Sequence, residues 1–309
     1  MMAKGLLVTS DRPPSPDRSQ ANATPEVTVL LPHYRCEPFL KDAVESVLAQ
    51  QGVDLQVWLV DDHSDGTRWF DAIVHLIGDP RLVVFRTSRN VGNYRIKNAL
   101  LPFVRSPFIA FQDADDISHP SRLRTQVAAI RQTGAGVMGC GFRYMSESGE
   151  ALGARRMVRN CNVWLRLGKC FVLLHPTSVV RREVFDTLGG FDGSVRIGAD
   201  DDFMLRAAAL YRIRNVQDIL YSYRRRPDSL TGSPSTGFDS DVRRAYSATV
   251  WNRAAERRRL RGRQALMECL QAPPNDIEFE VARMRPADRS WKHITAPDVA
   301  DDPRQPGIR

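Results

Sequence analysis

Short apolar runs alternate with amphipathic segments between residue 26 and about residue 233. The runs occupy residues 27–31, 55–60, 82–85 and 108–111. Their length and their β-branched and aromatic content predict buried strands. The first run is followed by apolar residues at helical spacing, which predict a helix with one buried face: Phe39, Leu40, Val44, Val47 and Leu48. Strands that alternate with helices are typical of an α/β fold with a largely parallel sheet.

The two ends of the chain differ from this middle part in composition. Residues 1–25 are rich in Ser, Pro, Asp and Arg and have no apolar period, so we expect a disordered leader. Beyond Ser233 the chain is polar, with one expected helix at about 242–270 and then a Pro-, Asp- and Arg-rich tail. The predicted division is a leader at 1–25, an α/β domain at 26–233 and a partly helical C-terminal extension at 234–309.

Composition limits the class of protein. A chain of 309 residues with 42% hydrophobic residues can bury a full core. Its five cysteines form no close pair of the kind that binds zinc, which favours reduced, mostly buried thiols. The apolar stretch at the N-terminus is too short for a secretion signal, and no run approaches the ~20 apolar residues of a membrane span. We therefore expect a cytoplasmic protein.

Acidic and polar residues gather where the expected strands end. The second strand is followed by Asp61 and Asp62, the third by Asn90, and the fourth by Asp113, Asp115 and Asp116. Ligands of open α/β sheets bind at the carboxyl ends of parallel strands. Carboxylates this close repel one another unless a cation lies among them, and Mg²⁺ or Mn²⁺ suits oxygen ligands and phosphates. The alternative is a solvated acidic turn.

A second acidic set, residues 200–202, stands at an evident helix start before Arg206. Negative side chains are favoured at a helix N-terminus, so a structural cap is a serious alternative to a catalytic role.

Basic residues account for the net charge of +8 and crowd residues 224–226 and 253–263. Such runs suit phosphates, anionic lipids or nucleic acid, but no nucleic-acid-binding module surrounds them. The second run could attach a helix to an anionic membrane through an apolar face formed by Trp251, Leu260, Leu266 and Leu270. Packing of that face on the α/β domain, with a solvated basic face outside, explains the pattern equally well.

Four ordered motifs resemble those of family 2 glycosyltransferases. They are residues 29–34 with Glu37, residues 46–50, residues 60–67 and residues 113–116. Residues 188–192 and 200–206 extend the resemblance into the acceptor half. It covers 26–233 and implies a GT-A fold, a Rossmann-like, mostly parallel mixed sheet flanked by helices, here with the C-terminal helical extension.

The resemblance implies roles for the residues at the nucleotide. By this resemblance, the nucleoside would be held by Pro32, Tyr34, Glu37 and Asp62, with Asp61 as a neighbour. Turns held by the two Asp side chains are an alternative for 61 and 62. Lys97, like Arg95, would face the diphosphate or else be an exposed helix charge. Residues 113–115 match the DXD metal motif. Asp115 would bind Mn²⁺ or Mg²⁺, Asp113 would reach the ribose or the metal, and Asp116 would support the metal site.

The acceptor side of the resemblance implies a general base. Counting back from Arg206, Asp200 takes the position of the family's catalytic Asp, while Ala199 replaces the usual Glu, so Asp201 stays a second candidate. In the loop after 223 the family often has a metal- or phosphate-binding His. Here Arg226 stands near that place and can pair with phosphate oxygens. His175 would lie on the acceptor side or in the core.

The function implied is a metal-dependent, inverting transfer of a sugar from a nucleotide-sugar to a hydroxyl acceptor. A carboxylate that accepts from the uracil imide favours UDP-sugar as donor. The acceptor would be a glycan, a lipid-linked glycan or a small molecule, in cell-surface polysaccharide or glycoconjugate biosynthesis. One alternative is a sugar-nucleotide-forming nucleotidyltransferase, although residues 32–37 contain no phosphate-loop glycine. Another is a non-catalytic nucleotide-binding module.

Overall fold

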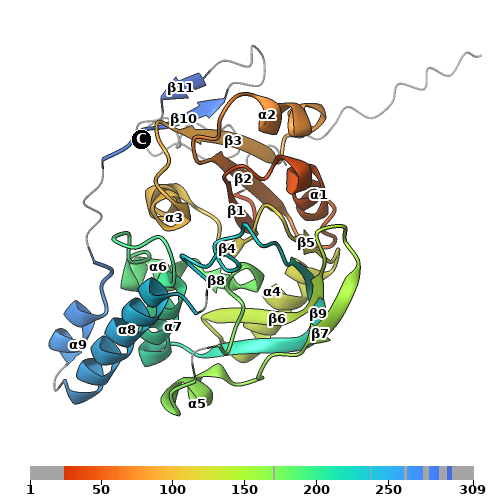
Figure 1. Ribbon diagram of the computed structural model, residues 1–309. Helices are drawn as coiled ribbons and strands as arrows, with labels where there is room; N and C mark the ends of the chain where they lie inside the picture. The colour runs from red at the N-terminus through yellow and green to blue at the C-terminus, as the bar shows by residue number, and fades with distance from the viewer. Residues whose placement is uncertain are drawn as a thin grey trace, which may run out of the picture.

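The structure is a computed structural model that describes residues 24–169, 171–237, 239–260, 263–273, 278–284 and 291–293. The expected leader falls almost wholly outside these ranges, as does much of the expected tail. Within them one sheet carries helices on both faces (Figure 1). This confirms the predicted mixed α/β class.

Among the described residues the sheet contains eleven strands, in the order β11-β10-β3-β2-β1-β4-β8-β6-β9-β5, with β7 paired to β6. The strands are β1 (Val27–His33), β2 (Leu55–Asp61), β3 (Leu82–Thr87), β4 (Phe108–Phe111), β5 (Ile117–Ser118), β6 (Val137–Met145), β7 (Ala151–Arg155), β8 (Val179–Arg181), β9 (Ile213–Arg224), β10 (Val281–Met284) and β11 (Trp291–His293). The predicted strands form the parallel part, β3-β2-β1-β4. The second half is mixed: β8 is antiparallel to β4 and β6, and β9 is parallel to β6.

Nine helices cover the sheet within the described ranges. They are α1 (Glu37–Leu48), α2 (Arg68–Ile73), α3 (Asn93–Leu100), α4 (Arg122–Thr133), α5 (Cys161–Arg166), α6 (Arg182–Leu188), α7 (Ala199–Leu210), α8 (Asp241–Arg259) and α9 (Arg263–Cys269). None of these helices is long and apolar enough to cross a membrane.

The alternation of strand side chains builds two cores, one on each face. Leu30 and Trp58 pack with residues of α3, α6, α7 and α8, whereas Val29 and Val57 pack with residues of α1, α2 and α4. Figure 1 shows the two groups of helices on opposite sides of the sheet. Because both faces are covered, the parallel strands are mostly apolar on both faces rather than alternating between apolar and polar residues.

The C-terminal extension packs on the α/β domain. Val250 and Ala254 of α8 and Leu270 after α9 are buried in the first core, and Trp251 and Leu266 pack against it. The structure therefore shows this apolar face packed on the α/β domain, which was the alternative to membrane attachment. The single helix expected at 242–270 is wrong in extent: α8 ends at Arg259, because Leu260 adopts an extended backbone with ψ 140°.

The thiols agree with the expectation of reduced, mostly buried cysteines. Among the described residues Cys36, Cys140 and Cys161 are buried and unpaired, and Cys269 is exposed.

Candidate active site

A cavity of about 1290 Å³ opens at the carboxyl ends of β1 and β4. Its walls also come from the loop before α3, the start of α7 and the loop after β9. The predicted site residues that line it are Pro32, Tyr34, Asp62, Asp113, Asp115, Asp200, Asp201 and Arg226. Four others, Glu37, Asp61, Lys97 and Asp116, are not among its lining residues.

Asp62 holds the loop between β3 and α3. Its carboxylate accepts hydrogen bonds from the backbone N–H of Val91 (2.8 Å) and Gly92 (2.7 Å) and from the Asn90 side chain (3.0 Å). Burial raises the pKa of Asp62, and the hydrogen bonds from the Val91 and Gly92 N–H groups oppose the rise. The side chain therefore shapes the cavity wall at the position expected for the nucleoside.

Asp61 lies behind that wall. It is fully buried, its Oδ1 accepts from the Ser64 N–H at 3.0 Å, and its Oδ2 pairs with Arg86 Nε at 3.1 Å. The turn predicted as an alternative role for Asp61 is thus present. Glu37 stands half-buried in the first turn of α1, outside the cavity lining.

The three carboxylates after β4 do not all face the cavity. Asp113 and Asp115 line the cavity, whereas Asp116 is fully buried and accepts from the Arg224 N–H at 2.7 Å. Asp115 Oδ2 pairs with Arg226 Nε at 2.9 Å. Burial raises the pKa of Asp113 to about 6, with Lys97 acting against the rise. Asp116 therefore ties β9 to the acidic loop instead of facing the cavity.

The donor set at Asp113 and Asp115 fits a hard divalent cation. No cluster of three or more His, Cys, Asp or Glu side chains in the described part of the chain is placed to hold a metal ion. Two carboxylates with substrate phosphates and water are, however, the usual magnesium environment in phosphate sites. The guanidinium beside Asp115 shows that a positive group is already accommodated there.

Lys97 lies behind the acidic loop. Its Nζ is 2.9 Å from His175 Nε2 and lies over the rings of Tyr94 and Phe111, at 5.6 and 4.9 Å from the centroids. Burial lowers its pKa to about 8, against the attraction of Asp113 and Asp200. His175 lines the cavity, and burial and Lys97 keep its pKa well below the usual value, so its ring is neutral. Lys97 thus faces the acidic groups from within the core.

The start of α7 contributes two carboxylates to the same cavity. Asp200 Oδ1 accepts a hydrogen bond from the Tyr94 hydroxyl at 2.6 Å. Burial and the neighbouring Asp200 raise the pKa of Asp201 to about 8. Neither caps the helix through its side chain: the N-cap is Gly198. Both carboxylates are therefore available to a ligand in the cavity.

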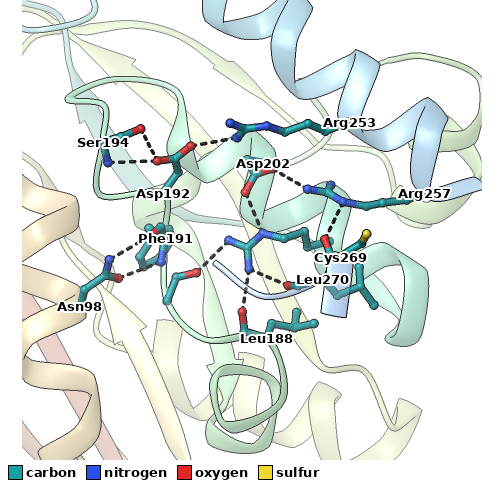
Figure 2. A network of polar contacts seen from close by, with 12 residues as sticks. Asn98, Leu188, Phe191, Asp192, Ser194, Asp202, Arg253, Arg257, Cys269 and Leu270 are labelled. Carbon is teal, nitrogen blue, oxygen red and sulfur yellow. Dashed lines mark hydrogen bonds and ion pairs between the residues drawn. The ribbon is translucent and has the colours of Figure 1, made fainter. Parts of the chain in front are cut away.

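Asp202, the third carboxylate of this set, is structural. It is fully buried and pairs with Arg206 Nε at 2.7 Å and with Arg257 Nη2 of α8 at 3.1 Å (Figure 2). Nearby, Asp192 pairs with Arg253 at 3.0 Å. Two arginines of the basic run at 253–263 are thus turned inward to buried carboxylates.

Several cavity residues escaped sequence reasoning. Tyr94 orients Asp200, and an aromatic wall faces the cavity from β6, β9 and the loop after α5: Phe142, Tyr144, Tyr223 and Phe171. The Arg225 guanidinium lies 4.2 Å from the centroid of the Tyr144 ring. Phe142 and Tyr144 are two residues apart on one strand, and side chains at this spacing point to the same face of a sheet. This spacing is the one sequence signal that could have placed them together.

The mixed sheet and the acidic cavity at its carboxyl edge define an α/β enzyme of the GT-A type. The family model for glycosyl transferase family 2 matches residues 28–189, a little over half of the chain, and the chain belongs to this family. The resemblance identified from the motifs is therefore confirmed, as is the class of enzyme.

Curated relatives agree with the family. The chain is 30% identical over 213 residues to the putative glycosyltransferase EpsE of Bacillus subtilis (strain 168), covering 67% of this chain and 76% of EpsE. It is 26% identical over 238 residues to the uncharacterized glycosyltransferase EpsJ of the same organism, covering 73% and 69%. It is 31% identical over 212 residues to the succinoglycan biosynthesis protein ExoO of Rhizobium meliloti (strain 1021), covering 64% and 58%.

Solved structures show the same fold. S. aureus TarS 1-349 in complex with UDP-GlcNAc aligns with a TM-score of 0.61 at 18% identity, over 79% of this chain and 70% of that chain. The mannosyltransferase PcManGT from Pyrobaculum calidifontis, in complex with GDP-Man and Mn²⁺, aligns with a TM-score of 0.55 at 18% identity, over 81% and 70%.

Proposed function

We propose that this glycosyltransferase moves a sugar from a UDP-sugar to a hydroxyl group of a glycan acceptor, with a divalent cation and with inversion at the anomeric carbon. One observation carries the proposal: Asp113 and Asp115 face the same cavity as Asp200 and Asp201. The first pair suits the diphosphate end of a donor and the second a hydroxyl that must lose a proton. A cytoplasmic location stays a prediction.

Different residues of the chain would have different roles in this reaction. Pro32 and Tyr34 would contact the nucleoside, beside the loop that Asp62 holds, and Arg226 would pair with diphosphate oxygens. A bound Mn²⁺ or Mg²⁺ would stabilise the leaving diphosphate as a Lewis acid. Asp200, oriented by the Tyr94 hydroxyl, would take the acceptor proton as the hydroxyl attacks C1. Attack from the face opposite the diphosphate gives inversion without a covalent intermediate.

Relatives support the donor and acceptor classes. TarS is seen with UDP-GlcNAc, and a 26% identical relative from Escherichia coli, WfaP, is named as a UDP-Glc-dependent glucosyltransferase acting on a diphosphoundecaprenol-linked sugar. ExoO is a succinoglycan biosynthesis protein. We infer from these names an acceptor in cell-surface polysaccharide synthesis. PcManGT, seen with GDP-Man, makes GDP the second nucleotide to examine.

The test is a calorimetric titration with UDP, GDP, dTDP and CMP, each with and without Mn²⁺. We expect metal-dependent binding of UDP that is lost in Asp115→Ala and kept in Asp186→Ala, an exposed carboxylate of α6. Selective binding of GDP would overturn the donor assignment. Failure of every nucleotide to bind would overturn the assignment of the donor and metal site to this cavity.

A further inference from the structure

The surface of α5 and of the loop after it is unusually apolar. Val163, Trp164, Leu167 and Phe171 are 48, 42, 68 and 38% exposed, and we call these four residues the α5 patch. Cys161 and Leu165 of the same helix are buried and attach it to the core. The inner face of α5 is thus packed on the core, and the helix still presents large apolar side chains to solvent. Contiguous exposed groups of this kind mark interaction surfaces.

The α5 patch lies in a basic segment without acidic residues. Residues 151–182 contain no Asp or Glu, but they contain seven Arg and Lys. Five of these seven are exposed on β7, on α5 and in the loops beside them: Arg155, Arg156, Arg159, Arg166 and Lys169. The Arg155 guanidinium lies 4.6 Å from the centroid of the Phe171 ring, so charge and apolar surface are in direct contact.

This combination fits the surface of an anionic bilayer. Trp and long basic side chains place an apolar body among the headgroups and a polar end in water. Basic residues near the surface add attraction to anionic lipids. A nucleic acid would match the charges but not Leu167 and Val163. The basic helix α8 is a weaker candidate, because Arg253 and Arg257 pair with Asp192 and Asp202 and Trp251 packs on the core.

The α5 patch adjoins the catalytic cavity. Phe171 belongs to the patch and also lines the cavity, beside Leu173 and Leu174. In Figure 1, α5 lies at the bottom of the molecule and α1 and α2 at the top, so the patch is far from the first strand ends, where the nucleoside is expected. A bilayer at α5 would therefore meet the acceptor side of the cavity and leave the donor side open to water.

We propose that the α5 patch docks this enzyme on an anionic lipid bilayer, with Trp164 and Leu167 inserted among the headgroups and the surrounding basic side chains on their phosphates. An acceptor attached to the bilayer then enters the cavity past Phe171. The docking itself is independent of the proposed function, whereas this last consequence rests on it.

The experiment is flotation of the full chain with vesicles of equal amounts of phosphatidylglycerol and phosphatidylcholine at low salt. Two variants separate the contributions: Trp164→Ser with Leu167→Ser for insertion, and Arg166→Glu with Lys169→Glu for charge. Arg258→Glu with Arg259→Glu on the exposed face of α8 is the matched control. We expect binding to fall about tenfold or more in each patch variant and to stay unchanged in the control.

A second readout locates the contact directly. Lipids brominated along the acyl chain should quench tryptophan fluorescence in the wild type, and this quenching should disappear in Trp164→Phe. Titration of UDP with Mn²⁺ in the absence of vesicles checks that each variant keeps its fold and nucleotide site. Absence of vesicle binding by the wild type, or an equal loss in the α8 control, would overturn the proposal. Failure of UDP to bind with vesicle binding intact would overturn only the proposed function.

Discussion

Arg226 occupies the position beside Asp115 in which a divalent cation is expected. Its Nε is 2.9 Å from Asp115 Oδ2, and its Nη2 is 3.7 Å from Cys36 Sγ. A divalent cation at the proposed site would therefore compete with this guanidinium for the carboxylate of Asp115. A bound diphosphate would remove the competition, since its oxygens give the arginine another partner. On the proposed function, Arg226 would couple the binding of metal to the binding of nucleotide.

Arg226→Met should make this coupling measurable. We expect Mn²⁺ alone to bind about five- to tenfold more tightly in the variant, because Asp115 is released, and UDP to bind about tenfold more weakly. Calorimetry with each ligand, alone and with the other present, measures both effects. Arg225→Met, in the same loop, is the control. Equal Mn²⁺ affinity in the wild type and in Arg226→Met would refute the competition.

Asp200 is the better candidate for the base, because the Tyr94 hydroxyl orients it. Asp200→Asn should lower kcat by about 10²- to 10⁴-fold, the usual contribution of a general base, with little change in UDP affinity. Steady-state kinetics together with UDP titration make the measurement. A larger loss of kcat in Asp201→Asn than in Asp200→Asn would transfer the role to the neighbouring carboxylate.

Asp201 should make stability depend on pH. Burial and Asp200 raise its pKa from 3.8 to about 8, so between these values the folded chain holds a proton that the unfolded chain has lost. The contribution of Asp201 to stability therefore falls as pH rises through this window. Asp201→Asn should melt at a higher temperature than the wild type near pH 8, with the difference vanishing near pH 4. Asp186→Asn should show no such trend.

The positions of individual side chains were only partly predictable. Asp113 and Asp115 line the cavity, as expected for residues close to the carboxyl end of a buried strand. The direction of Lys97 depends on His175, which lies 78 residues away, and that of Asp116 on Arg224, at a separation of 108. Local spacing carries no information about partners so distant in sequence.

Helix α8 and the start of α7 are joined by buried charge. Asp202 is the common partner of Arg206 in α7 and Arg257 in α8, and its side chain is inaccessible to solvent (Figure 2). Removal of one member of such a group leaves the others desolvated and unpaired. The C-terminal extension therefore helps to hold the helix start that carries Asp200 and Asp201.

Asp202→Asn should lower the free energy of unfolding by about 3 kcal/mol. Asp241→Asn is a matched change on α8, because Asp241 pairs with Arg244 but its side chain is 95% exposed. This control should cost less than about 1 kcal/mol. Urea unfolding followed by circular dichroism measures both. Equal losses of unfolding free energy in the two variants would contradict a larger contribution from the buried ion pairs of Asp202.

Elements were predictable where their apolar pattern is local. The parallel strands β1, β2, β3 and β4 are short, mostly apolar runs, and all four were predicted. Strand β6 contains Gly139 and Gly141, close to the Asn215 side chain and to the backbone of Asp218 in β9. Glycine gives no strand signal, and its small size is needed because neighbours distant in sequence, β9 among them, approach closely. Strand β10 is four residues long and is defined by its pairing with β3.

At the scale of the whole molecule, strand β10 protects an edge of the sheet. It pairs antiparallel with β3 through Val281, Ala282 and Arg283, and Val281 and Met284 are buried. Without it, β3 would present a row of unpaired backbone N–H and C=O groups beside Val83 and Phe85. Exposed edges of this kind recruit strands from other chains.

The segment that contains β10 would therefore protect the folded protein against association through the edge of β3. A protein that ends after Ala272 should keep its cavity, since none of the described residues beyond that point, 273, 278–284 and 291–293, lines it. We expect it to aggregate with time and concentration, as light scattering would record, while the full chain stays monodisperse. An added synthetic peptide of residues 278–293 should suppress this aggregation.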